Sequence, residues 1–589
     1  MSHLVVIPSA RIVAPAMQAE FGPVAPAMIP LAGRPALEWI ADAYPQADIC
    51  VAIHQAGQDV AAYLRRQREP RAHAVDVGAT DSIAETILRA AGDGAGYDRL
   101  TVHFADTLLD DTPAADDVIF WAQPIDLLRW TSFADYDGSI GTMIERDQPK
   151  TADGVEAVEQ KAQEQKAFVG VFQFADPQAF LADLAQAAEM PGAGIDPFFL
   201  ALKRYFNGRP PKARVLQYAT CWRDLGHVDN YYTAKRRVGL GPREFNAVDV
   251  DDRRGVMVKS SRNAKKLRNE IRWYQDLPQD LQFLAPRVFR ANLSHDMPSV
   301  EMEFYGYPPL NDLFLFGRLD VGAWTRIFDA VGFALEAMRT HSRPGEEQDR
   351  MTAARREIYL DKTLERLEPI VRDQRFAAMC EGTPKVNGQA VPSLPQICEE
   401  LPEIVEVAGL LSGPNFCVIH GDCCASNILY DPKNAFVRFI DPRGQFGSYS
   451  LSGDPRYDLA KLSHSFSGGY DFIVNGLFDV RLQGQEITLE VFAERHHQDI
   501  SDTFVGWLDG QAGADMGRIQ LIEALLFLSM TPLHADKPRS QLGFLANGLR
   551  LYAAAKAELG LTGRGQTAGK VSERDAPVSL KAEHRSIAV

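Results

Sequence analysis

Four polar residues interrupt the apolar runs of FCVIHGDCCASNILYDPKNAFVRFIDPRG, residues 416–444. FCVI, NILYD and AFVRFID predict short strands, and PKN predicts a turn between the last two. Because side chains at strand ends can share a cleft, we expect His420, Asp422, Asn427 and Asp441 to converge. A carboxylate there would accept the proton of a substrate hydroxyl, and Asn and Asp oxygens suit Mg²⁺. The alternative is ordinary turn chemistry, which Asp and Asn also favour.

The spacing of these residues favours the catalytic interpretation. Asp422 and Asn427 are five residues apart, as in the catalytic loop H-R-D-L-x-x-x-N of protein kinases. HGDCCASNILYD…FIDPRG resembles the aminoglycoside phosphotransferase and choline kinase-like family, as does GDPRYDLAKLSHS at residues 453–465. The resemblance implies an α+β bilobal protein-kinase-like fold. It also implies that Asp422 is the catalytic base and that Asn427 and Asp441 are the Mg²⁺ ligands.

Two further residues of the motif receive supporting roles from the resemblance. His420 is expected to support the loop, and Asp458 is interpreted as a helix cap rather than a catalytic group. Cys423 and Cys424 depart from the family, whose members often carry Leu-His or a similar pair there. We interpret them as small buried fillers, with a redox role as the alternative. Because of this departure, the resemblance does not indicate which molecule accepts the phosphoryl group.

A kinase-like fold also needs a small lobe before the catalytic loop. Residues 243–261, REFNAVDVDDRRGVMVKSS, predict an antiparallel hairpin, and residues 264–277, AKKLRNEIRWYQDL, predict an amphipathic helix. Lys259, near the end of its strand, is expected to bind the α- and β-phosphates of ATP and to pair with Glu270. The alternative is a solvated Lys on an edge strand.

The segment MEFYGY at residues 302–307 suits the hinge between the two lobes. Its backbone would meet adenine, which makes Glu303 and Tyr305 candidates for the ATP site. No G-x-G-x-x-G loop precedes Lys259, and GLGPREFN at residues 239–246 is a weak candidate for that loop.

In the first part of the chain, predicted strands alternate with predicted helices. LVVIPSA (residues 4–10), ADICVAIH (47–54) and RLTVHFAD (99–106) predict strands, and the first two predict buried parallel ones. RPALEWIADAY (34–44) predicts a helix, and DSIAETILRAAGDG (81–94) predicts another with an Asp N-cap. Alternation of strands and helices predicts an α/β doubly wound domain.

Several stretches of this part resemble sugar-1-phosphate nucleotidyltransferases in the order in which they occur. PLAGRPALEWI at residues 30–40 resembles the segment after their nucleotide loop. VHFADTLL and CWRDLGHVDNYYTAKR resemble their metal-binding elements, which makes Asp106 and Asp224 metal candidates. VEQKAQEQKAFVGVFQF resembles their sugar-phosphate element, which points to Glu159 and Lys161.

The segment at residues 8–31 departs from active members of that family. Those members carry a G-x-G-T-R loop and a P-K pair, whereas this segment has Arg11 as its only cation. A nucleoside triphosphate would be poorly neutralised there. Two interpretations stay open: a degenerate domain that binds a sugar-like ligand or serves as a scaffold, and a nucleotidyltransferase with altered contacts.

Composition narrows the choice of partners and location. The net charge of −16 argues against nucleic acid, whose phosphates need a basic surface. The 7 Cys include no C-x-x-C pair and suit reduced thiols in the cytoplasm. The N-terminus does not resemble a signal peptide, and no apolar run of about 18 residues predicts a membrane span.

The 589 residues predict two to four domains, and we place three segments along the chain. Residues 1–238 form the nucleotidyltransferase-like domain, and 239–565 form the phosphotransferase-like domain. The Gly- and Pro-containing segment VGLGP breaks a helix at their boundary. The polar tail at 566–589 lacks periodicity and is predicted to be disordered.

The sequence thus predicts an ATP- and Mg²⁺-dependent small-molecule kinase. It would phosphorylate a hydroxyl of a sugar, polyol or amino alcohol, in a surface-polysaccharide or sugar-nucleotide precursor pathway by analogy. One alternative is a bifunctional kinase and nucleotidyltransferase that also activates the product with an NTP. The other is a non-catalytic regulatory or scaffold protein built from pseudoenzyme domains. The acceptor and the oligomeric state are not predicted.

Overall fold

A computed structural model describes residues 2–66, 72–124, 126, 129–146, 165–190, 194–238, 246–251, 254–343, 348–511 and 516–561. Contacts divide the chain into two compact units. Unit 1 is residues 1–238 with 316–318, and unit 2 is residues 239–315 with 319–589. Within the described ranges, no helix combines the length and the apolar character needed to cross a membrane. The predicted disordered tail at 566–589 lies outside these residues.

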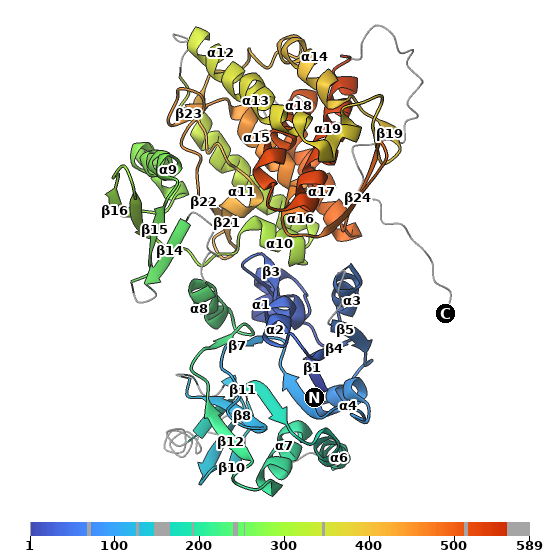
Figure 1. The fold of residues 1–589 in the computed structure, drawn as a ribbon. Coiled ribbons are helices and arrows are strands. Elements are labelled where there is room, and N and C mark those ends of the chain that lie inside the picture. The colour runs from blue at the N-terminus through green and yellow to red at the C-terminus, as the bar shows by residue number, and fades with distance from the viewer. Residues whose placement is uncertain are drawn as a thin grey trace. The chain divides into compact units, whose positions relative to one another are not determined.

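A nine-stranded mixed sheet organises unit 1 (Figure 1). The predicted parallel pairing is confirmed: β1 (His3–Ser9) lies between β4 (Asp48–Ile53) and β6 (Arg99–His103), parallel to both. On the other side of β6 lies β11 (Gln165–Phe174), which is antiparallel to it. The alternation of strands and helices in the sequence did not indicate this antiparallel strand. The other strands of the sheet are β5 (Ala72–Asp76), β8 (Asp117–Ala122), β9 (Ser132–Tyr136), β10 (Ser139–Ile144) and β12 (Arg214–Tyr218).

The helices predicted at residues 34–44 and 81–94 are confirmed as α2 and α4, with one correction. α4 (Ile83–Ala91) is capped by Ser82, whose hydroxyl accepts from the Glu85 N–H at 3.1 Å, so the predicted Asp cap is wrong. The Asp81 N–H instead donates to the Glu85 carboxylate. The remaining elements are α1 (Pro15–Phe21), β2 (Pro30–Leu31), β3 (Arg34–Pro35), α2 (Ala36–Ala43), α3 (Gly57–Arg66), β7 (Thr107–Leu109), α6 (Pro177–Ala188), α7 (Pro197–Gly208), β13 (Trp222–Asp224) and α8 (Val228–Val238).

Unit 2 begins with a four-stranded antiparallel sheet in the order β14-β15-β17-β16. The predicted hairpin is confirmed as β14 (Asn246–Asp251) and β15 (Val256–Ser261), and α9 (Ala264–Asp276) packs on the sheet (Figure 1). The Asn263 side chain caps α9. The sheet is completed by β16 (Val288–Asn292) and β17 (Ser299–Glu303).

The rest of unit 2 is mainly helical. A short hairpin, β21 (Ile428–Asp431) and β22 (Phe436–Phe439), lies within it where the sequence predicts two strands and a turn. The other elements are α10 (Leu310–Phe316), α11 (Val321–Thr340), α12 (Gln348–Arg356), the π-helical turn η5 (Glu357–Asp361), α13 (Lys362–Arg372), β18 (Lys385–Val386), β19 (Gln389–Ala390), α14 (Leu394–Val407), β20 (Cys417–Val418), β23 (Ser452–Gly453), α15 (Pro455–Phe466), α16 (Tyr470–Val474), β24 (Phe478–Gln483), β25 (Glu486–Val491), α17 (Arg495–Asp509), α18 (Met516–Met530), η8 (Thr531–His534) and α19 (Pro538–Glu558).

Candidate active site

An ion network joins three elements of unit 2. The Lys259 ammonium on β15 lies 2.8 Å from the Glu270 carboxylate on α9 and 2.7 Å from the Asp441 carboxylate after β22. Lys259 is 4% exposed and Glu270 is 2% exposed, so Lys259 is not the solvated edge residue of the alternative interpretation. Burial raises the pKa of Glu270 to about 7, against the effect of Lys259. Burial would lower the pKa of Lys259, but the two carboxylates hold it above its usual value.

Helix α9 positions this network through its buried face. Leu267, Ile271 and Tyr274 are buried on the face that also carries Glu270. The Tyr274 hydroxyl accepts a hydrogen bond from the Asp441 N–H at 3.0 Å. Asp441 has a φ of 57°, a left-handed conformation that Asp tolerates better than most residues. Backbone strain of this kind is concentrated at functional sites, which supports the predicted role of Asp441.

The loop between β20 and β21 is fixed by His420 and by Asp458. The His420 Nε2–H donates to the Ile440 carbonyl at 3.0 Å, and its Nδ1 accepts from the Asp422 N–H at 3.3 Å. Burial lowers the pKa of His420, which keeps the ring neutral in this arrangement. The ring therefore ties the catalytic loop to the end of the hairpin, as the supporting role requires.

Asp458 does not cap its helix, so that interpretation is wrong. Asp454 is the N-cap of α15, where it accepts from the Arg456 N–H. Asp458 lies one turn later and accepts from the backbone N–H groups of His420 and Gly421 at 2.7 and 2.8 Å. Burial raises its pKa to about 7. Asp458 thus holds the catalytic loop in place.

Asp422 has a partner that the sequence interpretation missed. The Lys461 ammonium on α15 lies 3.0 Å from the Asp422 carboxylate. Burial alone would raise the pKa of Asp422, but Lys461 holds it well below the usual range, so the carboxylate is ionised. Lys461 follows Asp458 by three residues, which places both on one face of α15. That spacing in GDPRYDLAKLSHS is the signal that could have identified Lys461.

Asn427 contacts the backbone of Asp422 and is buried. Its side-chain N–H donates to the backbone carbonyl of Asp422 at 2.8 Å, and the backbone carbonyl of Asn427 accepts from the Ile440 N–H. The contacts orient the amide so that its Oδ1 accepts from no other described residue. Asn427 Oδ1 and the Asp441 carboxylate are hard oxygen donors of the kind that Mg²⁺ takes alongside substrate phosphates. The described part of the chain contains no cluster of three or more His, Cys, Asp or Glu that could hold a metal by itself.

The two adjacent cysteines of the loop are buried, as predicted. Burial raises the pKa of Cys424 to about 12 and raises that of Cys423 further. Both thiols are therefore protonated and weakly nucleophilic near neutral pH. This argues for the packing role over the redox alternative.

The predicted hinge, residues 302–307, begins with the last two residues of β17. The Tyr305 hydroxyl donates to the Glu303 carboxylate, and the Arg438 guanidinium lies 4.2 Å from the centre of the Tyr305 ring. The Phe304 N–H donates to the Gly255 carbonyl at 2.9 Å, whereas no described backbone carbonyl accepts from the Tyr305 N–H. In the hinge interpretation, adenine would contact the backbone here. The weak glycine-loop candidate at 239–246 lies largely outside the described residues.

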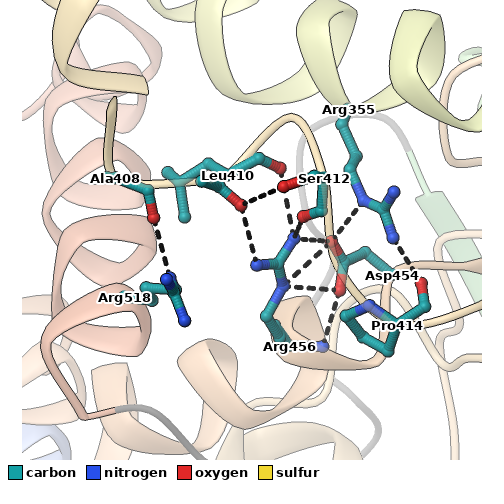
Figure 2. Close-up of polar contacts among 9 residues, drawn as sticks. Arg355, Ala408, Leu410, Ser412, Pro414, Asp454, Arg456 and Arg518 are labelled. Atoms are coloured by element: carbon teal, nitrogen blue, oxygen red, sulfur yellow. Dashed lines mark hydrogen bonds and ion pairs between the residues drawn. The ribbon is translucent and has the colours of Figure 1, made fainter. Parts of the chain in front are cut away.

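A buried cluster of charges anchors the start of α15 (Figure 2). The Asp454 carboxylate accepts from the Arg355 Nε at 2.9 Å and from the Arg456 guanidinium at 2.7 Å. Arg456 also donates to the carbonyls of Leu410 and Ser412. Because α15 carries Asp458 and Lys461, this cluster fixes the helix on which the catalytic loop depends.

Unit 1 brings its two predicted metal residues together. β13 pairs with β7, and the Leu225 N–H donates to the Asp106 carbonyl at 2.7 Å. Burial and the nearby Asp224 carboxylate raise the pKa of Asp106 to about 6. His227 Nδ1 lies 2.7 Å from Asp224, a contact that the sequence interpretation missed. Glu159 and Lys161, the predicted sugar-phosphate residues, lie outside the described residues.

The segment that departs from active nucleotidyltransferases offers little positive charge in the structure. Arg11, its only cation, donates to the backbone carbonyls of Thr80 and Asp81. The side chain is thus already engaged by neutral groups of its own unit. This observation agrees with the expectation that a triphosphate would be poorly neutralised there.

Comparisons with known proteins give one family match and several similar solved structures. No curated protein matches the chain. A thermostable aminoglycoside phosphotransferase mutant in complex with AMP-PNP and hygromycin B is 14% identical, with 54% of this chain and 92% of that chain covered and a TM-score of 0.33. The choline kinase LicA from Streptococcus pneumoniae is 14% identical, with 55% of this chain and 92% of that chain covered and a TM-score of 0.31.

A third solved structure covers a smaller part of the chain than these two. The inositol-1-phosphate CTP transferase from T. maritima is 9% identical, with 41% of this chain and 98% of that chain covered and a TM-score of 0.29. The family described as "Phosphotransferase enzyme family" matches residues 237–495, which include every residue of the candidate active site in unit 2. The C-terminal region of this chain thus matches the phosphotransferase enzyme family.

Proposed function

We propose that residues 239–565 act as an ATP-dependent phosphotransferase on the hydroxyl of a small molecule. The observation that carries the proposal is the buried network of Lys259, Glu270 and Asp441. A strand Lys, a helix Glu and an Asp after the hairpin are the parts that kinases use to hold the phosphates and the metal. The family match of residues 237–495 supports the same class of reaction.

In the proposed reaction, the acceptor hydroxyl oxygen attacks the γ-phosphorus of ATP. A new O–P bond forms, the bond from that phosphorus to the β–γ bridging oxygen breaks, and ADP leaves. The hydroxyl proton passes to the Asp422 carboxylate, which Lys461 keeps ionised. His420 and Asp458 hold the loop so that the carboxylate faces the acceptor.

Magnesium fits the donor set of this site. Asn427 Oδ1 and the Asp441 carboxylate would hold the ion, and Lys259 would bind the α- and β-phosphates. Bound Mg²⁺ neutralises the charge that develops on the phosphates. Glu303 and Tyr305 would flank adenine at the hinge. A sugar, polyol or amino alcohol acceptor, a surface-polysaccharide or sugar-nucleotide precursor pathway and a cytoplasmic location are likewise proposals.

Replacing Asp441 by Asn tests the nucleotide site. We expect Mg·ATP to bind about 10-fold to 100-fold more weakly, because hydrogen bonds and ligand contacts of a charged group contribute roughly 1.5–3 kcal/mol. Calorimetric titration of the full chain with ATP, with and without Mg²⁺, measures the change. The matched control is Asp296→Asn, a side chain that is 98% exposed. Equal Mg²⁺ dependence in Asp441→Asn and the unaltered protein would contradict the assignment.

The paired carboxylates Asp106 and Asp224 favour nucleotidyl transfer as a second candidate function. Because Arg11 is engaged by backbone carbonyls, we expect no pyrophosphate release from any NTP with common sugar 1-phosphates. A coupled pyrophosphate assay measures this. Robust release that disappears in both Asp106→Ala and Asp224→Ala would establish the bifunctional alternative instead.

A further inference from the structure

A cavity of about 530 Å³ opens beside Asp422 within unit 2. This volume falls in the range of small-molecule sites, roughly 300–1,000 Å³. Its walls come from the start of α9, the π-helical turn η5, and helices α13, α15 and α18. The Lys, Arg, Asp and Glu residues that line it are Lys265, Lys266, Lys362, Arg366, Asp422, Arg443 and Lys461.

The cavity reaches the Asp422 carboxylate but not the residues proposed to bind ATP. None of the residues proposed for ATP, namely Lys259, Glu270, Glu303, Tyr305 and Asp441, lines it, whereas Asp422 does. Lys265 and Lys266 begin α9, close to the proposed phosphate site, so they do not discriminate between nucleotide and acceptor. The basic residues that would contact the acceptor come from the other walls, which α13 and the segment after β22 form.

Three cations on those walls have no carboxylate partner among the described residues. Lys362 begins α13 and Arg366 lies one turn later, while Arg443 follows Asp441 along the chain. Arg366 donates to the Ser529 carbonyl at 3.1 Å, and Arg443 donates to the Tyr457 hydroxyl at 2.6 Å. Asp422, the only carboxylate that lines the cavity within the described residues, is already paired with Lys461.

Burial and the closeness of these basic groups disfavour their charged forms. Burial, together with Arg443 and Arg366, lowers the pKa of Lys362 to about 6. Burial and Arg443 also lower the pKa of Arg366. Like charges that are brought together without counter-charge disfavour the charged form, and a bound anion would relieve that cost.

Nearby acidic residues offset this repulsion only in part: Glu365 acts on Arg366 and Asp422 acts on Lys362, yet the pKa values of both basic groups stay lowered. A smaller adjoining cavity, about 340 Å³, shares Lys362, Arg366 and Arg443 and is also lined by three acidic residues. All three are exposed to solvent, where their effect is screened. They are Glu357, Asp361 and Glu365.

We propose that the phosphate acceptor is itself an anion, a hydroxyl compound whose phosphate or carboxylate group binds Lys362, Arg366 and Arg443. This inference rests on the proposed phosphotransferase function and specifies its substrate class. Guanidinium groups bind such oxyanions through two parallel N–H donors. The apolar side chains of α18 and η8, among them Leu525, Leu526 and Leu533, would contact the carbon skeleton. An amino alcohol, whose ammonium these cations would repel, does not suit the cavity.

Matched pairs of hydroxyl compounds test the acceptor class. The full chain is incubated with Mg·ATP and one compound at a time, and ADP formation and product mass are measured. The matched pairs are glycerol and glycerol 3-phosphate, glucose and glucose 6-phosphate, and glucose and gluconate. Ethanolamine is the cationic compound. We expect turnover of anionic members only. In Arg366→Met, KM for the anionic acceptor should rise about tenfold or more, since a charged hydrogen bond is lost, while KM for ATP is unchanged. Arg372→Met, an exposed position on the same helix, is the control.

A binding measurement tests the cavity without turnover. Inorganic phosphate is titrated calorimetrically into the full chain with Mg·AMP-PNP present to fill the nucleotide site. Binding that weakens about tenfold in Arg366→Met, but not in Arg372→Met, would support the inference. Absence of phosphate binding, or equal binding in both variants, would overturn it.

The two proposals fail in different ways. Turnover of neutral or cationic members at rates equal to their anionic counterparts, unaffected by Arg366→Met, would overturn the anionic acceptor and leave the phosphotransferase standing. Phosphate binding that depends on Arg366, together with no binding of Mg·ATP at all, would support the anion site and contradict the phosphotransferase.

Discussion

Replacing Asp422 by Asn is expected to lower turnover by at least about 10²-fold, the low end of what a general base contributes. Asn keeps the shape of the side chain but cannot take the hydroxyl proton. Mg·ATP should still bind, because the proposed nucleotide contacts are Lys259, Asn427 and Asp441 rather than Asp422. Steady-state kinetics and calorimetric titration of ATP separate the two effects.

The Asp422 variant needs a control for folding, because it removes the charge that partners buried Lys461. Its urea unfolding should therefore be compared with that of the unaltered chain at the assay temperature. Asp296→Asn, the exposed control, should leave both turnover and stability unchanged. Near-normal turnover in a folded Asp422→Asn protein would show that Asp422 is not the base.

Replacing Asp454 by Ala is expected to destabilise unit 2 by about 3–5 kcal/mol, the cost of breaking a buried ion pair and leaving its partner uncompensated. Arg355 and Asp454 are both completely buried, and Arg456 shares the same carboxylate (Figure 2). Urea unfolding followed by circular dichroism measures the loss. Glu368→Ala removes an exposed ion pair with Arg372 and should cost at most about 1 kcal/mol.

The same carboxylate predicts a pH dependence of stability. Although burial would raise its pKa, Arg456 and Arg355 hold the pKa of Asp454 below the usual value. A carboxyl whose folded pKa is depressed contributes stability above its unfolded pKa and loses it as the pH falls toward the folded value. The free energy of unfolding should therefore fall in acid, with a shallower slope in Asp454→Asn. Equal slopes would contradict the proposed pairing.

The features that the sequence predicted are those that local pattern encodes. Buried parallel strands such as β1 and β4 read as continuous apolar runs, and the structure confirms their pairing. Lys259 on β15 pairs with Glu270 on α9, as predicted, whereas its contact with Asp441 was not predicted. In unit 1, Asp224 ends β13 and Asp106 immediately precedes β7, and the pairing of β13 with β7 brings the two together; β6 itself ends at His103, before the predicted strand end at residue 106.

The features that it missed depend on contacts between distant segments. Asp458 was assigned to its own helix because an Asp near a helix start usually caps it, whereas it binds backbone N–H groups of the catalytic loop. Lys362 and Arg366 lie on a helix whose periodicity shows only that one face is buried. Nothing in that local pattern shows that they line one cavity together with Arg443 and Asp422.

The most direct test of the account is γ-phosphoryl transfer by the full chain. The protein is incubated with Mg·ATP and the panel of hydroxyl compounds, and mass spectrometry follows ADP and any compound that gains one phosphoryl group. The account predicts equal amounts of ADP and phosphorylated product with the unaltered protein and at least about 10²-fold less product with Asp422→Asn. Product formation that persists unchanged in Asp422→Asn, or a folded protein that neither binds Mg·ATP nor phosphorylates any compound, would contradict it.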